Sequence, residues 1–185
     1  MKKKIVELVK DTIPVVLGVL IALIIGNWKQ QYDNQQYIDK MLATMKVEAE
    51  SNLKEIQETI PKHIRLSDTI QYYMDSEVSL SEIVMKSSGI QLPTIANRTW
   101  NAVIDSRVEL VDYSTLSVVT QIDESKELLL KKMDHLIDHV YQNLVSTEES
   151  DKFLLLMHVS NVIDSEQRLK KLHEEFLEEI GPTAK

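Results

Sequence analysis

The chain has 185 residues, a formal net charge of −8, 43% hydrophobic residues and no cysteine. Without Cys, disulfides, thiolate metal ligands and cysteine nucleophiles are excluded. Only 4 Gly and 4 Pro are present, and no two glycines are close enough for a dinucleotide fingerprint, a P-loop or a nucleophile elbow. Because sharp turns need Gly, Pro, Asn or Asp, this composition favours an all-α fold.

The most apolar segment lies near the N-terminus, where residues 12–26 read TIPVVLGVLIALIIG without a charge. A helix over this segment spans about 22 Å, against about 30 Å for the hydrocarbon core, and flanking residues supply the rest. A cleaved signal peptide is the main alternative, but the small-residue pair needed for cleavage is missing before Gly26. We therefore expect a transmembrane helix over residues 13–28, with Trp28 as its interfacial anchor.

The distribution of lysine predicts the orientation of this helix. Four lysines lie within residues 2–10, whereas Lys29 and Lys40 are the only basic residues in the fifteen positions after the span. Cytoplasmic flanks carry the excess of Lys and Arg. Residues 1–12 are thus expected to be a short basic tail in the cytoplasm, and residues 29–185 to lie outside it.

Three small residues, Gly18, Ala22 and Gly26, fall on one face of the predicted transmembrane helix. Small residues at this spacing let two helix backbones pack closely in lipid, which predicts a homo-oligomer or docking to another helix. Gly and Ala are also frequent in membrane helices in general, so a plain anchor is the alternative.

Charge limits the partners of the remaining chain. Residues 29–185 carry 17 Lys and Arg but 27 Asp and Glu. An acidic domain of this kind repels nucleic acid and anionic lipid. We expect the bilayer around the anchor and a protein partner or second copy elsewhere, but no nucleic acid.

Residues 29–76 contain no Gly and one Pro, and their apolar residues recur every three or four positions. This pattern predicts a long membrane-proximal helix with a coiled-coil-like seam for a partner helix. Pro61 predicts a kink, or even a division into two helices. His63 and Ser67 fall on the same face, where they form a buried polar pair, contact a ligand or lie at the kink. The predicted seam consists of Leu42, Ala49, Leu53, Ile56, Ile60, Ile70 and Met74.

Residues 77–113 are less regular and predict short helices joined by a connector. Ser79 or Ser81 is positioned to cap the first short helix, and Gly89 is positioned to end it.

A second short helix is predicted over residues 95–107, with Thr94 as its cap. Trp100 is the largest apolar side chain of this region. We therefore expect Trp100 to be a core aromatic that packs between helices.

Residues 114–180 predict an antiparallel helical hairpin. Ser114 is positioned to cap its first helix and Thr147 to cap its second. Residues 153–159 read FLLLMHV and are apolar on every face, which predicts deep burial or a covering subunit.

The best candidate for metal chemistry is the pair His135 and His139, which lie one helical turn apart and can share a divalent ion. On a helical wheel centred on Met133, however, both side chains point away from the core. Leu136 occupies the position where a zinc protease motif has Glu, and no His follows an acidic residue by three positions, as a di-iron bundle requires. We therefore predict no metal, no cofactor and no catalytic residue, with His135 and His139 as weak metal candidates.

Two segments carry a resemblance: LGVLIALIIGNWKQQ at residues 17–31 and TWNAVIDSRVELVDYSTL at residues 99–116. They resemble a family of uncharacterised bacterial single-pass membrane proteins, classed as a domain of unknown function. Its members begin with an apolar helix containing Gly-x-Leu-Ile-Ala-Leu, followed by Asn-Trp and a long charged helix. Gly26 stands where members usually carry a second Asn. The resemblance implies an anchor in the bacterial inner membrane and an all-helical outer domain, without catalytic residues.

These patterns lead to one expected function and two alternatives. The expected function is a membrane-anchored helical interaction or scaffold protein, or an accessory subunit of an envelope complex, without catalysis. The first alternative is a single-pass sensor-like bundle that binds a small ligand outside the cytoplasm. The second is a metal-dependent enzyme that uses His135 and His139.

Overall fold

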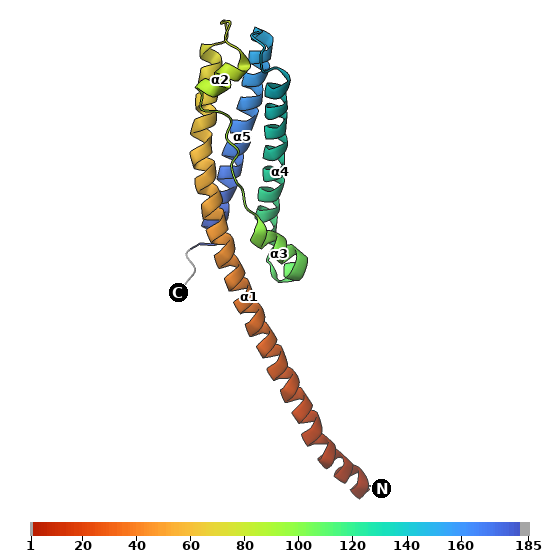
Figure 1. Ribbon diagram of the computed structural model, residues 1–185. Helices are drawn as coiled ribbons and strands as arrows, with labels where there is room; N and C mark the ends of the chain where they lie inside the picture. The colour runs from red at the N-terminus through yellow and green to blue at the C-terminus, as the bar shows by residue number, and fades with distance from the viewer. Residues whose placement is uncertain (1, 182–185) are drawn as a thin grey trace. The chain divides into compact units, whose positions relative to one another are not determined.

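The structure is a computed structural model that describes residues 2–181, apart from the side chains of residues 2–11 and Asp105. The predicted basic tail therefore lies almost wholly outside the described side chains. The predicted all-α fold is confirmed, since every regular element of the described residues is a helix. The elements are α1 (Lys2–Tyr72), α2 (Leu80–Lys86), α3 (Arg98–Arg107), the 3-10 helix η1 (Val108–Leu110), α4 (Tyr113–Gln142) and α5 (Glu149–Glu179) (Figure 1).

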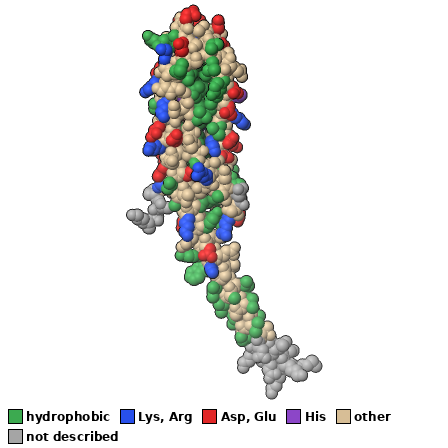
Figure 2. All heavy atoms as spheres, viewed as in Figure 1, with side chains coloured by type: hydrophobic (Ala, Val, Ile, Leu, Met, Phe, Trp, Pro, Cys, Tyr) green, Lys and Arg blue, Asp and Glu red, His purple; other side chains and the backbone are tan. Residues whose placement is uncertain are grey.

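The chain divides into two compact units, residues 1–41 and 42–185, and the first consists of the N-terminal part of α1. Its large aliphatic side chains between Ile13 and Ile25 are 48–67% exposed, and Trp28 is 77% exposed. Figure 2 shows hydrophobic side chains on the surface of this part of the chain. Among the described helices, α1 is the one that is long and apolar enough to cross a bilayer. A helix that could span a membrane is therefore present where the sequence predicts it.

The helix α1 continues through Pro61, so the predicted division at this residue is wrong. A proline inside a helix leaves the carbonyl four residues earlier, here that of Gln57, without its N–H partner. Both residues are exposed, so water can satisfy the freed carbonyl without ending the helix.

The second unit is a three-helix bundle made of the C-terminal part of α1, α4 and α5 (Figure 1). Residues 143–148 join α4 and α5 into the predicted antiparallel hairpin, and α1 also runs antiparallel to α5. Burial of each core side chain contributes about 1.5–3 kcal/mol to folding. The most deeply buried apolar side chains of these three helices are Ile56, Leu66 and Ile70 of α1, Leu129, Met133 and Leu136 of α4, and Leu155, Val159, Val162, Leu169 and Phe176 of α5.

The first row of the predicted α1 seam is mostly buried, and the second row is displaced by one residue. In the first row Ala49, Ile56 and Ile70 are buried, whereas Leu42 is half-buried. In the second row the predicted residues Leu53, Ile60 and Met74 are half-buried. The residues buried in their place include two polar ones, which a search for apolar residues alone does not find: Met45, Asn52, Thr59 and Leu66.

Lys152, in the first turn of α5, is fully buried and closes the end of α1. Its Nζ donates hydrogen bonds to the carbonyl oxygens of Tyr73 at 3.0 Å and Met74 at 3.3 Å, and to that of Ser76. Carbonyls at the end of a helix have no further N–H partner within the helix, and the helix dipole favours a cation there. Lys152 therefore attaches α5 to the C-terminal end of α1.

The start of α3 is fixed by α1 and not by Thr94, the predicted cap. The carboxylate of Glu48 accepts the backbone N–H groups of Arg98 at 2.7 Å and Thr99 at 3.1 Å. These are two of the N–H groups that a helix leaves without partners at its N-terminus. The helix accordingly begins at Arg98 instead of residue 95.

The two predicted caps of the hairpin are also wrong. Asp112 caps α4, because its carboxylate accepts the Thr115 N–H at 2.9 Å and the Ser114 hydroxyl at 2.6 Å. These hydrogen bonds lower the pKa of Asp112 to about 2. At α5 the N-cap position belongs to Glu148 instead of Thr147, and its side chain makes no capping hydrogen bond.

The apolar stretch 153–159 is buried on one face only. Leu155 and Val159 are in the core, whereas Phe153, Leu154 and Met157 are 46–54% exposed. The prediction of deep burial is therefore wrong for these three side chains within a single chain. The alternative, that another subunit covers them, stays a prediction.

Replacing the buried lysine, Lys152→Met, should lower the free energy of unfolding by about 2–4 kcal/mol, because three carbonyls each lose a hydrogen bond from its ammonium group. Urea unfolding of the full-length protein in mild detergent, followed by circular dichroism, measures this difference. Lys171→Met is the matched control, since that side chain is 76% exposed, and its effect should stay within about 0.5 kcal/mol. Equal effects of the two substitutions would contradict the role given to Lys152.

Candidate functional site

An open apolar groove lies on the second unit between α2, the connector that follows it, and the end of α4. We call it the α2–α4 groove, and its volume is about 350 Å³. Figure 2 shows hydrophobic side chains gathered in the upper part of the bundle. The lining residues are Ser81, Val84 and Met85 of α2, Ile90 and Leu92 of the connector, and Ile137, Val140, Tyr141 and Leu144 of α4 and the residues just after it.

The helix α2 is held against the loop after α4 by its backbone. Ser79 and Glu82 form a capping box, so Ser79 is the cap that the sequence offered together with Ser81. The N–H groups of Leu80 and Ser81 donate to the carbonyls of Ser146 and Leu144, both at 3.0 Å. These bonds fix one wall of the groove relative to the other.

A tight turn after α2 directs the connector back along the groove. Ser88 and Gly89 have φ values of +80° and +83°, and the Gly89 N–H donates to the Val84 carbonyl at 2.8 Å. Gly89 therefore ends α2 as predicted, because glycine adopts positive φ without a steric penalty. The turn places Ile90 and Leu92 on the groove.

Several side chains of the groove remain in contact with water although they are large and apolar. Met85 and Tyr141 are each 70% exposed, Leu92 is 52% exposed and Leu144 is 39% exposed. Contiguous exposed apolar surface of this kind marks interaction sites in soluble domains. The α2–α4 groove is therefore the candidate functional site.

The charged residues beside the groove are mainly acidic. Glu82 of α2 and Asp134 and Asp138 of α4 are exposed, and Asp134 precedes the groove residue Ile137 by one helical turn. Lys86 lies 5.5 Å from the centre of the Tyr73 ring, in a cation–π contact. The C-terminal end of α4 adds the negative end of its helix dipole.

Sequence reasoning missed this groove, although a signal was present. Ile90 and Leu92 alternate with polar residues in a segment without helical periodicity, and Tyr141 and Leu144 continue the apolar pattern of α4 to its end. Only the contact between α2 and the loop after α4 brings these residues together.

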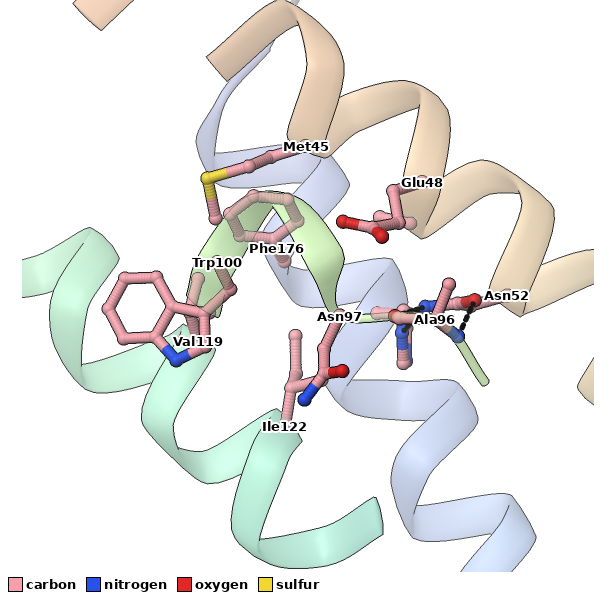
Figure 3. A pocket seen from close by; sticks show the side chains of 11 residues that line it. Met45, Glu48, Asn52, Ala96, Asn97, Trp100, Val119, Ile122 and Phe176 are labelled. Atoms are coloured by element: carbon pink, nitrogen blue, oxygen red, sulfur yellow. Dashed lines mark hydrogen bonds between the residues drawn. The ribbon is translucent and has the colours of Figure 1, made fainter. Parts of the chain in front are cut away.

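A small pocket of about 40 Å³ lies beside the buried Trp100 (Figure 3). One water molecule needs about 10–15 Å³ by this kind of measure, whereas ligand pockets have about 300–1,000 Å³. This pocket therefore has room for water and not for an organic ligand.

Next to this pocket, Asn52 links three parts of the chain. Its amide exchanges two hydrogen bonds with the backbone of Ala96, at 2.7 and 2.9 Å. The same Nδ2 lies 3.2 Å from Nε2 of His173, whose Nδ1 lies 2.9 Å from the Leu169 carbonyl. A neutral His173 with its proton on Nδ1 satisfies both contacts. Burial lowers the pKa of His173, and the Leu169 carbonyl opposes this effect in part.

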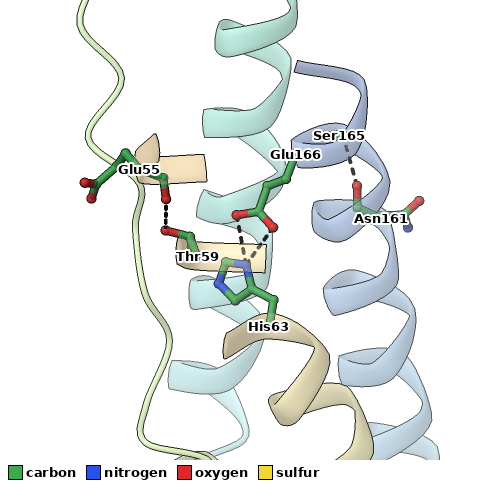
Figure 4. Close-up of polar contacts among 6 residues, drawn as sticks. All are labelled: Glu55, Thr59, His63, Asn161, Ser165 and Glu166. Carbon is green, nitrogen blue, oxygen red and sulfur yellow. Dashed lines mark hydrogen bonds and ion pairs between the residues drawn. The ribbon is translucent and has the colours of Figure 1, made fainter. Parts of the chain in front are cut away.

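A second buried polar contact joins α1 to α5 (Figure 4). Nδ1 of His63 lies 3.0 Å from each carboxylate oxygen of Glu166, and both side chains are fully buried. Within the described part of the chain, Nε2 of His63 is the one buried side-chain nitrogen or oxygen atom without a hydrogen-bond partner. His63 is thus a buried polar residue on the seam, as one of the predicted alternatives had it. Its partner, however, is Glu166 and not Ser67, which is half-buried.

The two weak metal candidates differ in their surroundings. His135 is exposed, whereas His139 is half-buried, with Nε2 2.9 Å from the carbonyl oxygen of Asp151. The wheel prediction is therefore wrong for His139, because α5 covers that flank of α4. The ring of His158 lies 5.3 Å from that of His139. Burial lowers the pKa of His158, and the nearby His139 and His135 lower it further. No group of three potential ligands arranged for a metal is found among the described residues.

The predicted membrane-packing residues lie on the exposed part of α1. Gly18, Ala22 and Gly26 are exposed, and a Cβ added at either glycine meets no atom within 4 Å in a single chain. Whether they join two copies stays a prediction.

No family model, curated protein or solved structure matches this chain. The resemblance carried by residues 17–31 and 99–116 therefore stays a prediction. The function has to be inferred from the chemistry of the molecule itself.

Acidification should lower the free energy of unfolding through His173. Its folded pKa lies below the unfolded value of about 6.5, so the unfolded state takes up the proton first. The contribution of this neutral histidine is complete above about pH 6.5 and is lost as the pH falls toward the folded pKa. Urea unfolding of the full-length protein between about pH 7.5 and pH 5 measures the slope.

His173→Gln keeps an acceptor for Asn52 but removes the titration, so it should flatten this slope. His135→Gln, at an exposed histidine, is the control and should leave the slope unchanged. A slope that His173→Gln does not alter would contradict the assignment.

Proposed function

We propose that this chain is a membrane-anchored interaction protein, whose helical bundle binds a protein partner and so acts as a scaffold or as an accessory subunit of an envelope complex. The N-terminal part of α1 serves as a single-pass anchor, with residues 1–12 in the cytoplasm and the bundle outside it. The membrane in question is the bacterial inner membrane, as the resemblance implies.

The anchor is supported by exposed apolar surface and by charge. Continuous aliphatic surface between Ile13 and Ile25 is unfavourable in water and favourable in lipid. The four lysines within residues 2–10 support a cytoplasmic N-terminus. The acidic character of residues 29–185 supports a position away from anionic headgroups.

The observation that carries the proposal is the α2–α4 groove. Its walls are fixed by a capping box and by backbone hydrogen bonds. Apolar side chains that remain exposed in the folded chain are available to a partner. The volume of the groove, about 350 Å³, falls in the range of ligand pockets, but the groove is open and its large side chains Met85, Leu92 and Tyr141 are exposed, which favours a protein partner over the small ligand of the sensor-like alternative.

The orientation can be tested directly because the chain contains no cysteine. Lys171→Cys, at a side chain of α5 that is 76% exposed and does not line the groove, should react with a membrane-impermeant maleimide in cells with a permeabilised outer membrane. Lys3→Cys should react only after the inner membrane is opened. The reverse pattern would contradict the proposed topology.

The partner can be tested by photo-crosslinking in living cells. A photoreactive amino acid at position 85 or 141 should give a crosslinked product of defined mass, which mass spectrometry identifies. The same amino acid at position 171, where the side chain of Lys171 is 76% exposed on α5 and does not line the groove, is the control. Equal crosslinking at all three positions, or none at any of them, would overturn the proposal that the groove binds a protein.

A further inference from the structure

The α2–α4 groove has a chemistry that restricts what it can bind. Its lining is aliphatic and aromatic, and the polar side-chain atoms among its nine lining residues are the hydroxyl groups of Ser81 and Tyr141. An occupant gains free energy here by burying apolar side chains and not by pairing polar groups. Its contacting face must therefore be apolar.

The length of the groove limits the size of that face. Along α4 the lining extends from Ile137 to Leu144, and α2 has 7 residues. Each wall is thus about 10 Å long, which equals about two turns of an α-helix. Two turns present apolar side chains at positions i, i+3 or i+4, and i+7.

The walls favour a helix over an extended strand as the occupant. A strand that binds by its backbone needs the free edge of a sheet, and every regular element in residues 2–181 is helical. A helix satisfies its own backbone hydrogen bonds, so it can lie on a surface that offers almost no polar groups.

Charge then selects the polar face of that helix. Glu82 follows the lining residue Ser81, Asp134 and Asp138 lie within one helical turn of the lining residue Ile137, and the last turn of α4 forms part of the groove. The single basic side chain of α2, Lys86, contacts the ring of Tyr73. An occupant with Lys or Arg on both sides of its apolar stripe is complementary to this rim.

We propose that the α2–α4 groove binds a short amphipathic helix of a partner protein, about two turns long, with a stripe of Leu, Ile or Phe flanked by Lys or Arg. This inference rests on the proposed function and specifies the partner's binding segment. It also distinguishes that segment from an anionic lipid surface, which the acidic rim repels.

The test uses the full-length protein in nanodiscs of neutral lipid and three fluorescent peptides of about 14 residues each. The first peptide has a Leu stripe flanked by Lys, the second has the same stripe flanked by Glu, and the third has the Lys and Leu composition of the first without a stripe. Fluorescence anisotropy measures their affinities. We expect the first peptide to bind at least ten times more tightly than the other two.

Two sets of variants assign the binding to the groove and its rim. Met85→Glu and Tyr141→Glu, at exposed side chains, should weaken binding of the first peptide at least tenfold, whereas Met157→Glu on α5 should not. Asp134→Lys combined with Asp138→Lys should remove the preference for the Lys peptide, whereas Asp164→Lys should leave it. Circular dichroism confirms that each variant is folded.

Each outcome decides the question. Equal affinity for the Lys and Glu peptides, or binding that Met85→Glu does not weaken, would overturn the proposed helix. Vesicles of anionic lipid that bind the wild type but not Met85→Glu would assign the groove to a membrane surface and overturn it as well. If a protein partner is crosslinked at position 141 but no peptide binds, the proposed function stands and only the amphipathic helix is refuted. If no partner is crosslinked and no peptide binds, both the proposed function and the amphipathic helix are refuted.

Discussion

A buried polar group must find a hydrogen-bond partner, and in this bundle that requirement decides how α1 lies against α5. An apolar core alone tolerates a shift by one heptad, because each heptad presents similar side chains. The contacts of Asn52 with His173, and of His63 with Glu166, do not tolerate such a shift. Lys152 adds a third contact at the end of α1. Polar side chains thus fix the register of a helix whose other core residues are apolar.

The same helix face also determines the path of the connector between α2 and α3. Asn52 binds the backbone of Ala96, and Glu48 binds the first N–H groups of α3. The other end of the connector is fixed by the turn at Gly89. A segment without regular structure is therefore held at both ends by specific hydrogen bonds, and its two apolar residues Ile90 and Leu92 can form part of a defined surface.

The helices could be predicted from the sequence because hydrophobic periodicity and low Gly and Pro content are local signals. The place of Asn52 in the seam and the partner of His63 could not be predicted, since both side chains bind residues far away in sequence. The cap at Ser79 was predicted correctly. The caps of α4 and α5 were misplaced by one or two residues, because several neighbouring polar residues can take the N-cap position. The N–H groups of α3 bind Glu48 of another helix, which no local pattern indicates. The groove was beyond sequence reasoning for the same reason, because its walls meet only through the loop after α4.

The separation of these contacts along the chain has a consequence for synthesis. His63 and Glu166 are 103 residues apart, and Asn52 and His173 are 121 residues apart. The α4–α5 hairpin closes over a short loop, and local contacts of that kind form quickly. Chain elongation proceeds at about 5–20 residues per second, so several seconds pass between the synthesis of the polar residues of α1 and that of their partners in α5. During that interval water can hydrate Asn52, Thr59 and His63, so the seam of α1 exposes less apolar surface than an all-apolar seam would before α5 is made.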